Sequence, residues 1–355
     1  MTSRSHCHSE PDEASGPTPA ARHTPPRILV IRYRFIGDTV LAIPFLRNLR
    51  RAFPASVIDV LAEPISGDTL AHCPYKNELL YFAPRAKKKS PHPRSLLACA
   101  RLLRHRRYDR VYILRRSFSS AILPLLAGIP HRVGFATEGR RWLLQRSAPY
   151  PDNKHEVECF LDILRADGIQ VLDTHNENWS DPAVDRRVAA GLPDSRRRRV
   201  FLCAKSIVPE KDWTVDRFAA IAGWLIAERN CEIHFCDAPS NAAHYAEILS
   251  LLPASLRAHC HDWSRKLPLR DLNSLLRYTD LAVGIDTGLL HIAASFHIPI
   301  VALFGPLEPW RWHPWDTAHT ILRPADLSGP KPLARLSVAE VQSALDRHLS
   351  SLPSS

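Results

Sequence analysis

Short apolar runs alternate with amphipathic segments along most of the chain. The first apolar run, residues 27–32, is typical of a buried parallel strand. The next segment carries apolar residues on one helical face as far as Phe53, and a second apolar run follows at residues 56–62. A strand, a helix and a strand in this order form a βαβ unit, whose right-handed crossover predicts a parallel sheet.

The same alternation continues to the end of the chain. It predicts two doubly wound α/β halves, with strands near residues 79–82, 110–114, 132–135, 200–204, 232–236 and 299–306 and helices over residues 94–107, 156–167, 214–229, 240–252, 269–278 and 337–349. A further apolar run ends at Asp286, and a helical pattern begins at Thr287, with its apolar face extending to His297.

Breaks in this alternation suggest the domain organisation. Residues 1–26 are rich in Ser, Pro, His and Thr without periodicity, so we expect them to be disordered. Residues 169–198 lack a strong period and end in an arginine run, which is compatible with a solvated turn or with an anion-binding segment. The expected units are an N-terminal domain over residues 27–175, a linker over 176–198, a C-terminal domain over 199–335, and a C-terminal helix and tail over 336–355.

Composition limits the class of protein. The 355 residues are 45% hydrophobic and 23% charged, as in soluble globular proteins. The net charge of +11 indicates an acidic partner, which could be nucleic acid, anionic lipid or a phosphorylated substrate. No apolar run approaches the roughly 20 residues of a transmembrane span, and the N-terminus lacks a signal-peptide core. We therefore expect a cytoplasmic protein.

Cysteine usage predicts neither a disulfide framework nor a metal site. The eight cysteines are scattered without a Cys-x-x-Cys pair, which is typical of reduced thiols. Two His-Cys-His clusters, at residues 6–8 and 259–261, lack the second half of a zinc site at suitable spacing. We therefore expect no bound metal.

Two polar turns follow apolar runs, at the carboxyl ends of strands where parallel sheets bind ligands. The first turn is Gly37-Asp38, and the second is Asp286-Thr287-Gly288, where a hydroxyl and free N–H groups at a helix start form a natural anion site. The alternative for both carboxylates is a helix cap. Neither turn has a Gly-x-Gly-x-x-Gly or Walker lysine motif, which argues against the usual dinucleotide and P-loop families.

Three groups of motifs occur in order between residues 27 and 323. They are the segment from Ile28-Leu29-Val30-Ile31-Arg32 through Gly37-Asp38 to Pro54, the segment Pro209-Glu210-Lys211-Asp212-Trp213, and the segment from Asp286-Thr287-Gly288 through His291 and residues 299–306 to Trp312-His313-Pro314-Trp315. Together they resemble glycosyltransferase family 9, the ADP-heptose:lipopolysaccharide heptosyltransferases. Each motif alone is a weak signal, but their order makes the resemblance strong.

The resemblance implies a fold of the GT-B type, in which two Rossmann-like doubly wound α/β domains face each other across a cleft. It places the acceptor, a lipopolysaccharide inner core, against the N-terminal domain and the donor, ADP-heptose, against the C-terminal one. It also implies an inverting, metal-independent transfer. The ADP-sugar would then be a substrate, and no cofactor would be needed.

The resemblance also assigns roles to individual residues. Asp38 matches the catalytic base of the family. The donor-binding positions are Lys211 near the diphosphate, Asp286, Thr287, Gly288 and Leu289 in the diphosphate loop, His291 on the donor side, and Ser206 near a hydroxyl position.

The chemistry of these residue types agrees with an inverting transfer. Such a reaction needs a base on the face opposite the leaving group, and a carboxylate such as Asp38 on the facing domain suits that role. The ADP leaving group gains negative charge, which Lys211 and the helix start at Thr287 can stabilise. The chain contains no Asp-x-Asp, the metal–diphosphate motif of other sugar transferases. This absence and the resemblance both predict that no metal is required.

Several basic residues are candidates for contacts with an anionic acceptor. Arg32, Arg115 and Arg116 lie at strand ends, although each is also compatible with a carboxylate partner or with solvent exposure. His291 is likewise compatible with a packed core histidine. Lipopolysaccharide precursors lie on the cytoplasmic leaflet, so we expect peripheral membrane contact, with Lys87-Lys88-Lys89 as one candidate.

Two loops depart from the family pattern. Residues 236–239, Cys-Asp-Ala-Pro, stand where Gly-Gly is common near the nucleotide, and residues 204–206, Ala-Lys-Ser, replace a glycine-bearing loop. These departures leave open a transferase that uses another nucleotide sugar or acceptor, or a degenerate homologue without activity. A basic nucleic-acid-binding protein is disfavoured, because no recognised module is present and the aromatic residues do not alternate with the basic clusters.

Overall fold

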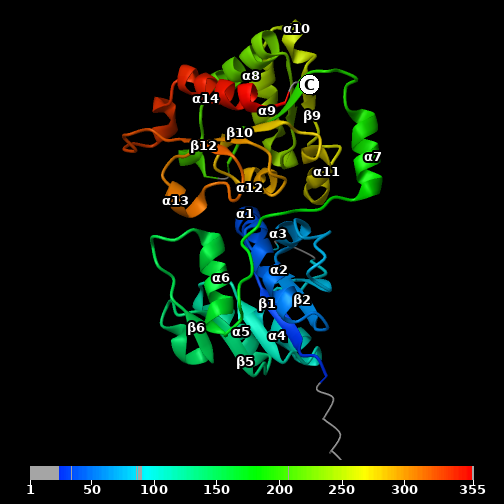
Figure 1. The fold of residues 1–355 in the computed structure, drawn as a ribbon, viewed down its shortest axis with the longest axis vertical. Coiled ribbons are helices and arrows are strands. Elements are labelled where there is room, and N and C mark those ends of the chain that lie inside the picture. Colours follow the sequence, from blue (N-terminus) through cyan, green and yellow to red (C-terminus); the bar gives the residue numbers. More distant parts are fainter. Residues whose placement is uncertain (1–23, 33, 85, 87–89, 207, 354–355) are drawn as a thin grey trace, which may run out of the picture.

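The computed structural model describes residues 24–353, apart from residues 33, 85, 87–89 and 207. It contains two six-stranded sheets, one in each half of the chain, which form two lobes joined at a narrow junction (Figure 1). Most of the segment expected to be disordered, and the lysines at 87–89, lie outside the described residues.

The N-terminal half is a parallel sheet with the strand order β3-β2-β1-β4-β5-β6. Its strands are β1 (Arg27–Ile31), β2 (Val57–Ala62), β3 (Glu78–Tyr81), β4 (Arg110–Ile113), β5 (His131–Phe135) and β6 (Arg146–Ala148). Its helices are α1 (Ile36–Val40), α2 (Ile43–Ala52), α3 (Pro64–Asp68), α4 (Leu96–His105), α5 (Phe118–Leu126), the 3₁₀ turn η1 (Arg140–Leu143) and α6 (Glu156–Ala166).

The C-terminal half is a second parallel sheet, with the order β12-β11-β10-β7-β8-β9. Its strands are β7 (Arg198–Cys203), β8 (Cys231–Phe235), β9 (Cys260–Asp262), β10 (Leu281–Ile285), β11 (Ile300–Leu303) and β12 (His319–Leu322). Its helices are α7 (Pro182–Gly191), α8 (Val215–Arg229), α9 (Ala242–Ser250), α10 (Ala254–Arg257), α11 (Leu272–Leu276), α12 (Gly288–Ala294), α13 (Pro309–Trp312) and α14 (Val338–Ser351), with 3₁₀ turns η2 (Pro209–Lys211), η3 (Pro239–Asn241), η4 (Leu269–Asp271) and η5 (Pro332–Arg335).

Both sheets have the same topology, and both match the predicted doubly wound α/β fold. In each half the order runs outward in two directions from the first strand, so it reverses between β1 and β4 and between β7 and β10. Ligands bind at such reversal points in open α/β sheets. At the second one, a Cβ on Gly284 would lie 2.1 Å from the carbonyl oxygen of Cys203, so the close pairing of β10 with β7 requires glycine there.

The two halves pack against each other through apolar and polar contacts. One cluster of buried residues runs from Phe45 and Phe160 in the N-terminal half to Leu289 and Phe304 in the C-terminal half. Burial of apolar area of this kind is the main force that holds the lobes together.

A polar clamp reinforces this packing beside α6. Arg311 of α13 lies 4.5 Å from the ring of Tyr150, and its Nη1 donates to Glu156 Oε2 at 3.4 Å. His155 donates from Nε2 to the carbonyl oxygen of His313 at 3.1 Å and stacks on Trp315 with ring centroids 4.4 Å apart.

Some elements differ from the sequence prediction. The pattern does not predict α5, because its residues are apolar on several faces and include Pro124. It also does not predict the strands β6, β9 and β12, which lie at or near the edges of the sheets and are only three or four residues long. The predicted linker contains α7, which begins at Pro182 after Asp181, whose side chain accepts from Ala183 N–H. No described helix is long and apolar enough to span a membrane.

Two predicted helices have different limits in the structure. The helix after the first strand is divided into α1 and α2, because Pro44 near the start of α2 has no N–H to continue the ladder. Helix α12 ends at Ala294, and His297 lies beyond it with a φ of 57°, so it is not part of the helical face we predicted.

The interdomain histidine His155 predicts a pH dependence of stability. Its Nδ1 accepts from Val157 N–H and its Nε2 donates to His313, so the neutral ring satisfies both partners. Burial lowers the pKa of His155 from 6.5 to about 3. Below about pH 6.5, His155 is protonated in the unfolded chain but stays neutral in the folded chain. The stability conferred by the neutral ring is therefore lost as the pH falls toward 3.

We expect His155→Gln to reduce the acid sensitivity of the free energy of unfolding. The wild type should lose up to about 1.4 kcal/mol per pH unit more than the variant below pH 6.5, measured by denaturant unfolding between pH 7 and 4. His105→Gln is the matched control, since His105 lies exposed in the last turn of α4 and its ring is not buried on folding. Equal slopes for the wild type and His155→Gln would contradict this account.

Candidate functional site

The turn after β1 and the start of α12 touch at the junction between the halves. A Cβ on Gly37 would lie 2.5 Å from His291 Cδ2, and a Cβ on Gly288 would lie 2.8 Å from the backbone nitrogen of Gly37. Figure 1 shows α1 directly below α12 at this point. The structure thus brings together the two polar turns that sequence patterns selected independently.

Asp38 lies inside the first turn of α1 and does not cap it. The helix begins after Phe35, which has a φ of 66° and makes no side-chain cap bond. The Asp38 carboxylate pairs instead with the guanidinium of Arg32, whose side chain is buried, while 18% of the Asp38 side chain remains exposed. Asp38 is therefore a carboxylate that a buried cation holds in place and that solvent or a ligand can still reach.

Lys211 and Asp286 form the corresponding pair in the C-terminal half. Lys211 Nζ donates to Asp286 Oδ2 at 2.7 Å and to the Asp286 carbonyl oxygen at 3.2 Å. Asp286 therefore does not cap α12, which begins after Thr287 without a side-chain cap bond. The Thr287 hydroxyl is buried and has no hydrogen-bond partner among the described residues. A cationic amine, an unpaired hydroxyl and the first N–H groups of a helix together form a set of donors for an anion.

His291 lies between the two carboxylates. Its Nε2 is 3.9 Å from Asp286 Oδ1, and its ring packs on Gly37 of the other half. Burial lowers the pKa of His291, against the opposing effect of the Asp286 and Asp38 charges, so the imidazole is neutral near pH 7. His291 is thus buried, as a core residue would be, but it is buried at the junction rather than inside one half.

A second buried carboxylate, Glu156, was not selected from the sequence. Its side chain accepts from the Tyr150 hydroxyl and pairs with Arg311, and burial together with the nearby charge of Asp38 raises its pKa. Along the chain, Tyr150 is 6 residues from Glu156 and Arg311 is 155 residues from it. No local motif could therefore reveal this cluster.

The three arginines proposed for the acceptor lie in different environments. Arg32 is buried and pairs with Asp38, so of its alternatives the structure shows a carboxylate partner. Its guanidinium also lies 5.6 Å from the Phe160 ring. Arg116 is exposed after β4, with its guanidinium 4.7 Å from the Tyr150 ring. Arg115 is half-buried, and its carbonyl oxygen accepts from Arg140. Of the three, Arg116 is the most open to a ligand.

The loops that depart from the family pattern lie at the ends of β7 and β8. Ser206 accepts from the Val208 N–H at 3.1 Å in its own loop, and the described residues show no hydrogen bond between it and Thr287 or His291. Asp237 follows β8, accepts from Tyr245 at 3.1 Å, and has a pKa raised by burial. An acidic residue after the second strand is where Rossmann-type domains hold a ribose, so Asp237 is a candidate that the sequence reasoning missed.

Two groups of histidine and acidic side chains that could attract a metal contain none of the junction residues described above. The first is the cluster at residues 259–261, which we expected not to bind metal. Its His259 and His261 rings both lie within hydrogen-bond distance of the Glu232 carboxylate, at 3.1 and 2.7 Å. Within the described ranges, one group of side chains has suitable spacing for a metal, namely His175, His297 and Asp316, and all three are exposed.

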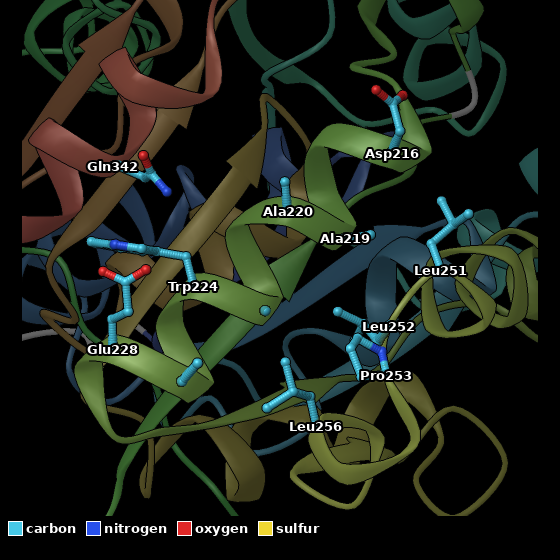
Figure 2. A pocket seen from close by; sticks show the side chains of 12 residues that line it. Asp216, Ala219, Ala220, Trp224, Glu228, Leu251, Leu252, Pro253, Leu256 and Gln342 are labelled. Atoms are coloured by element: carbon cyan, nitrogen blue, oxygen red, sulfur yellow. The ribbon is translucent and has the colours of Figure 1, made fainter.

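A hollow of about 590 Å³ lies on the outer side of α8 (Figure 2). It is bordered by Trp224, Leu252 and Leu256, and its lining includes the carboxylates Asp216 and Glu228 but no lysine or arginine. This charge is of the wrong sign for a phosphorylated ligand. The junction between the halves therefore remains the candidate site.

Two Rossmann-like halves that meet at their ligand-binding edges define the GT-B class of glycosyltransferases. A model of glycosyltransferase family 9 (heptosyltransferase) matches residues 96–337. The chain belongs to this family and is a glycosyltransferase. Asp38 lies before the matched residues, so its place in the site rests on the geometry above.

Individual relatives agree with the family. Lipopolysaccharide heptosyltransferase 2 of Escherichia coli (strain K12) is 29% identical over 294 residues, which cover 80% of this chain and 84% of the relative. The solved structure of E. coli ADP-heptose lps heptosyltransferase II is similar with a TM-score of 0.78 and 25% identity, over 91% of this chain and 98% of that one. A family 9 glycosyltransferase from Veillonella parvula DSM 2008 shares the fold, with a TM-score of 0.81, 21% identity, and coverage of 94% and 100%.

The glycine contact predicts that both Gly37→Ala and Gly288→Ala disable the enzyme. Each added methyl meets the opposite half at 2.8 Å or less, so the methyl at Gly37 displaces the buried His291 ring and the methyl at Gly288 pushes against the backbone of the other half. We expect sugar transfer to fall by about 100-fold, because small displacements of reacting groups have effects of that size. Gly223→Ala in α8 is the control, since its methyl meets only leucine side chains, with the nearest at 3.3 Å.

The measurement is the transfer rate, combined with thermal unfolding to confirm that each variant is folded. If Gly288→Ala transferred sugar as fast as Gly223→Ala, the contact would not organise the site.

Proposed function

We propose that this enzyme transfers a heptose from ADP-heptose to the inner core of lipopolysaccharide, with inversion at the anomeric carbon. The observation that carries the proposal is the Gly37–Gly288 contact, which joins the turn that carries Asp38 to the start of α12, where Thr287 and the Lys211–Asp286 pair supply donors for an anion. The names of the relatives support heptose as the sugar and the lipopolysaccharide core as the acceptor.

In the proposed mechanism, Asp38 accepts the proton of the acceptor hydroxyl. The acceptor oxygen attacks the anomeric carbon on the face opposite ADP, a new C–O bond forms, and the C–O bond to the diphosphate breaks. The electron pair of the broken bond remains on the departing ADP. Lys211 Nζ, the Thr287 hydroxyl and the N–H groups of Gly288 and Leu289 stabilise that charge. The neutral imidazole of His291 offers one hydrogen-bond donor and one acceptor at the junction without adding charge.

The donor side supports catalysis without metal or cofactor. Lys211 is a cation, Thr287 offers a hydroxyl, and the nearby Asp286 carboxylate is already paired with Lys211. Such a set neutralises a diphosphate directly, whereas a metal-dependent site would require free carboxylates. Asp286 holds Lys211 in place, and the diphosphate must compete with it for the amine.

We assign residues 27–175 to the acceptor and residues 199–335 to the donor. Arg116, which is exposed beside Tyr150, is the favoured acceptor contact, with Arg115 next to it and Arg32 acting through Asp38. The enzyme works at the cytoplasmic face of the membrane on this proposal, and nucleic acid is not a partner. Transfer from another nucleotide sugar is the alternative that the Asp237 loop keeps open, because the loop departs from the family pattern where the nucleotide binds.

The base assignment predicts that Asp38→Asn lowers transfer by at least about 100-fold. The amide cannot take the acceptor proton, but the donor side is unchanged, so binding of ADP-heptose should persist. Transfer is measured in the presence of EDTA, binding by calorimetry, and folding by thermal unfolding, since the buried Arg32 loses its partner. Asp68→Asn is the control, because Asp68 lies in α3 and its bond from Tyr81 survives as an amide contact. Near-normal turnover of Asp38→Asn would exclude the assignment, and loss of activity of the wild type in EDTA would exclude metal independence.

The diphosphate assignment predicts that Lys211→Ala weakens donor binding by about tenfold or more, because a charge-assisted bond is lost. Lys266→Ala is the matched control, because the Lys266 amine lies 5.3 Å from the Trp263 ring.

A thermal-shift panel of ADP-, UDP- and GDP-sugars should give the greatest stabilisation with the ADP-sugar. Unchanged affinity in Lys211→Ala, or a larger shift with another nucleotide, would contradict the respective part of the proposal.

A further inference from the structure

One stretch of the N-terminal half concentrates the positive charge of the chain. Residues 79–137 contain thirteen lysines and arginines but a single acidic residue, Asp109. The whole chain has 47 basic and 36 acidic residues, so this imbalance is local. The stretch includes α4 and α5, which lie side by side on one face of the first sheet.

Helix α5 has an apolar face that the protein covers only in part. Phe118, Ile122 and Leu125 recur at the spacing of one helical face; Phe118 and Ile122 are half-buried against the core of this half, and 43% of Leu125 is exposed. The neighbouring Trp142 of η1 is 72% exposed, with its ring centroid 6.3 Å from that of Phe118. An exposed tryptophan beside a partly exposed apolar helix face is typical of an interaction surface.

Helix α4 extends this surface with a basic stripe. Leu97 is 58% exposed, and Arg101 and Arg104 follow it on the same helical face. Arg104 Nη2 donates to the Leu126 carbonyl oxygen at 2.7 Å, so this stripe lies directly beside the end of α5. Neither helix contains an acidic residue. The nearby Glu138 is bound to the Phe118 N–H at 2.7 Å, at the positive end of α5.

The surface adjoins the candidate site. Helix α5 begins two residues after Arg116, at the carboxyl end of β4, next to β1. The apolar end of the surface, formed by Phe118 and Trp142, is therefore the end nearest the domain junction. A ligand anchored in a layer under this face could reach Arg116 and Asp38 from the same side.

We propose that the face formed by Leu97, Arg101, Arg104, Phe118, Leu125 and Trp142 docks on a bilayer with anionic headgroups. Indole rings favour the interfacial region of a bilayer, apolar side chains insert into it, and arginines bind the phosphates. Anionic lipid fits this mixture of apolar and basic groups better than a uniformly polar polyanion does. The inference rests on the proposed function only in the claim that docking presents the acceptor to Asp38.

The test uses the full chain and sedimentation with vesicles of phosphatidylethanolamine and phosphatidylglycerol, compared with vesicles of phosphatidylcholine. We expect binding to the anionic vesicles that weakens with added salt. Arg101→Glu and Trp142→Ser should each weaken binding by at least about fivefold, through lost electrostatic attraction and lost apolar insertion, respectively. Leu251→Ser and Arg186→Glu, both at exposed positions in the C-terminal half, are the matched controls and should bind as the wild type does.

A second readout separates docking from catalysis. Trp142→Ser should keep the wild-type rate on a short water-soluble acceptor and lose rate on an acceptor embedded in vesicles. Failure to transfer heptose to either acceptor, with vesicle binding intact, would contradict the proposed function and leave the docking face standing. Equal vesicle binding by the face variants and the controls would overturn the docking proposal. So would a wild-type dimer that Trp142→Ser converts to a monomer without any change in vesicle binding, since the face would then join two copies of the chain.

Discussion

The contact between Gly37 and Gly288 is the constraint on which the rest of the site depends. Because neither residue has a Cβ, the backbones of the two halves meet directly, and the starts of α1 and α12 come together at the reversal points of their sheets. A side chain at either position would separate them. This approach buries His291, whose ring lies within electrostatic range of both Asp286 and Asp38.

Each half contributes one cation–carboxylate pair to this junction, but the two pairs have opposite roles. In the N-terminal half the buried Arg32 positions Asp38, which stays partly exposed, whereas in the C-terminal half the buried Asp286 positions Lys211. The arrangement leaves a carboxylate that solvent can reach in the N-terminal half, and a cation with an unpaired hydroxyl in the C-terminal half. The ring of His291 is neutral, so it adds no charge of its own near the carboxylates of Asp286 and Asp38.

Local sequence patterns predicted the elements that local physics determines. The apolar runs of parallel strands and the polar turns at Asp38 and Thr287 are visible in short windows, and the structure confirms the doubly wound fold and their proximity. The cluster of Glu156 with Arg311 depends on packing between residues 155 apart, which no window contains. Helix α5 was missed for a related reason, since its apolar residues cover several faces and carry no clear period. The partner of Arg32 was left open between an acceptor and a carboxylate, because only the folded turn places Asp38 beside it.

The most direct test of the central claim is a crystal structure of the full chain with a non-transferable ADP-heptose analogue. The account predicts that the diphosphate binds the Thr287 hydroxyl and the amine of Lys211, with the anomeric carbon facing the Asp38 carboxylate across the Gly37–Gly288 contact. A diphosphate bound elsewhere, for example in the hollow beside α8, or an anomeric carbon turned away from Asp38, would contradict it.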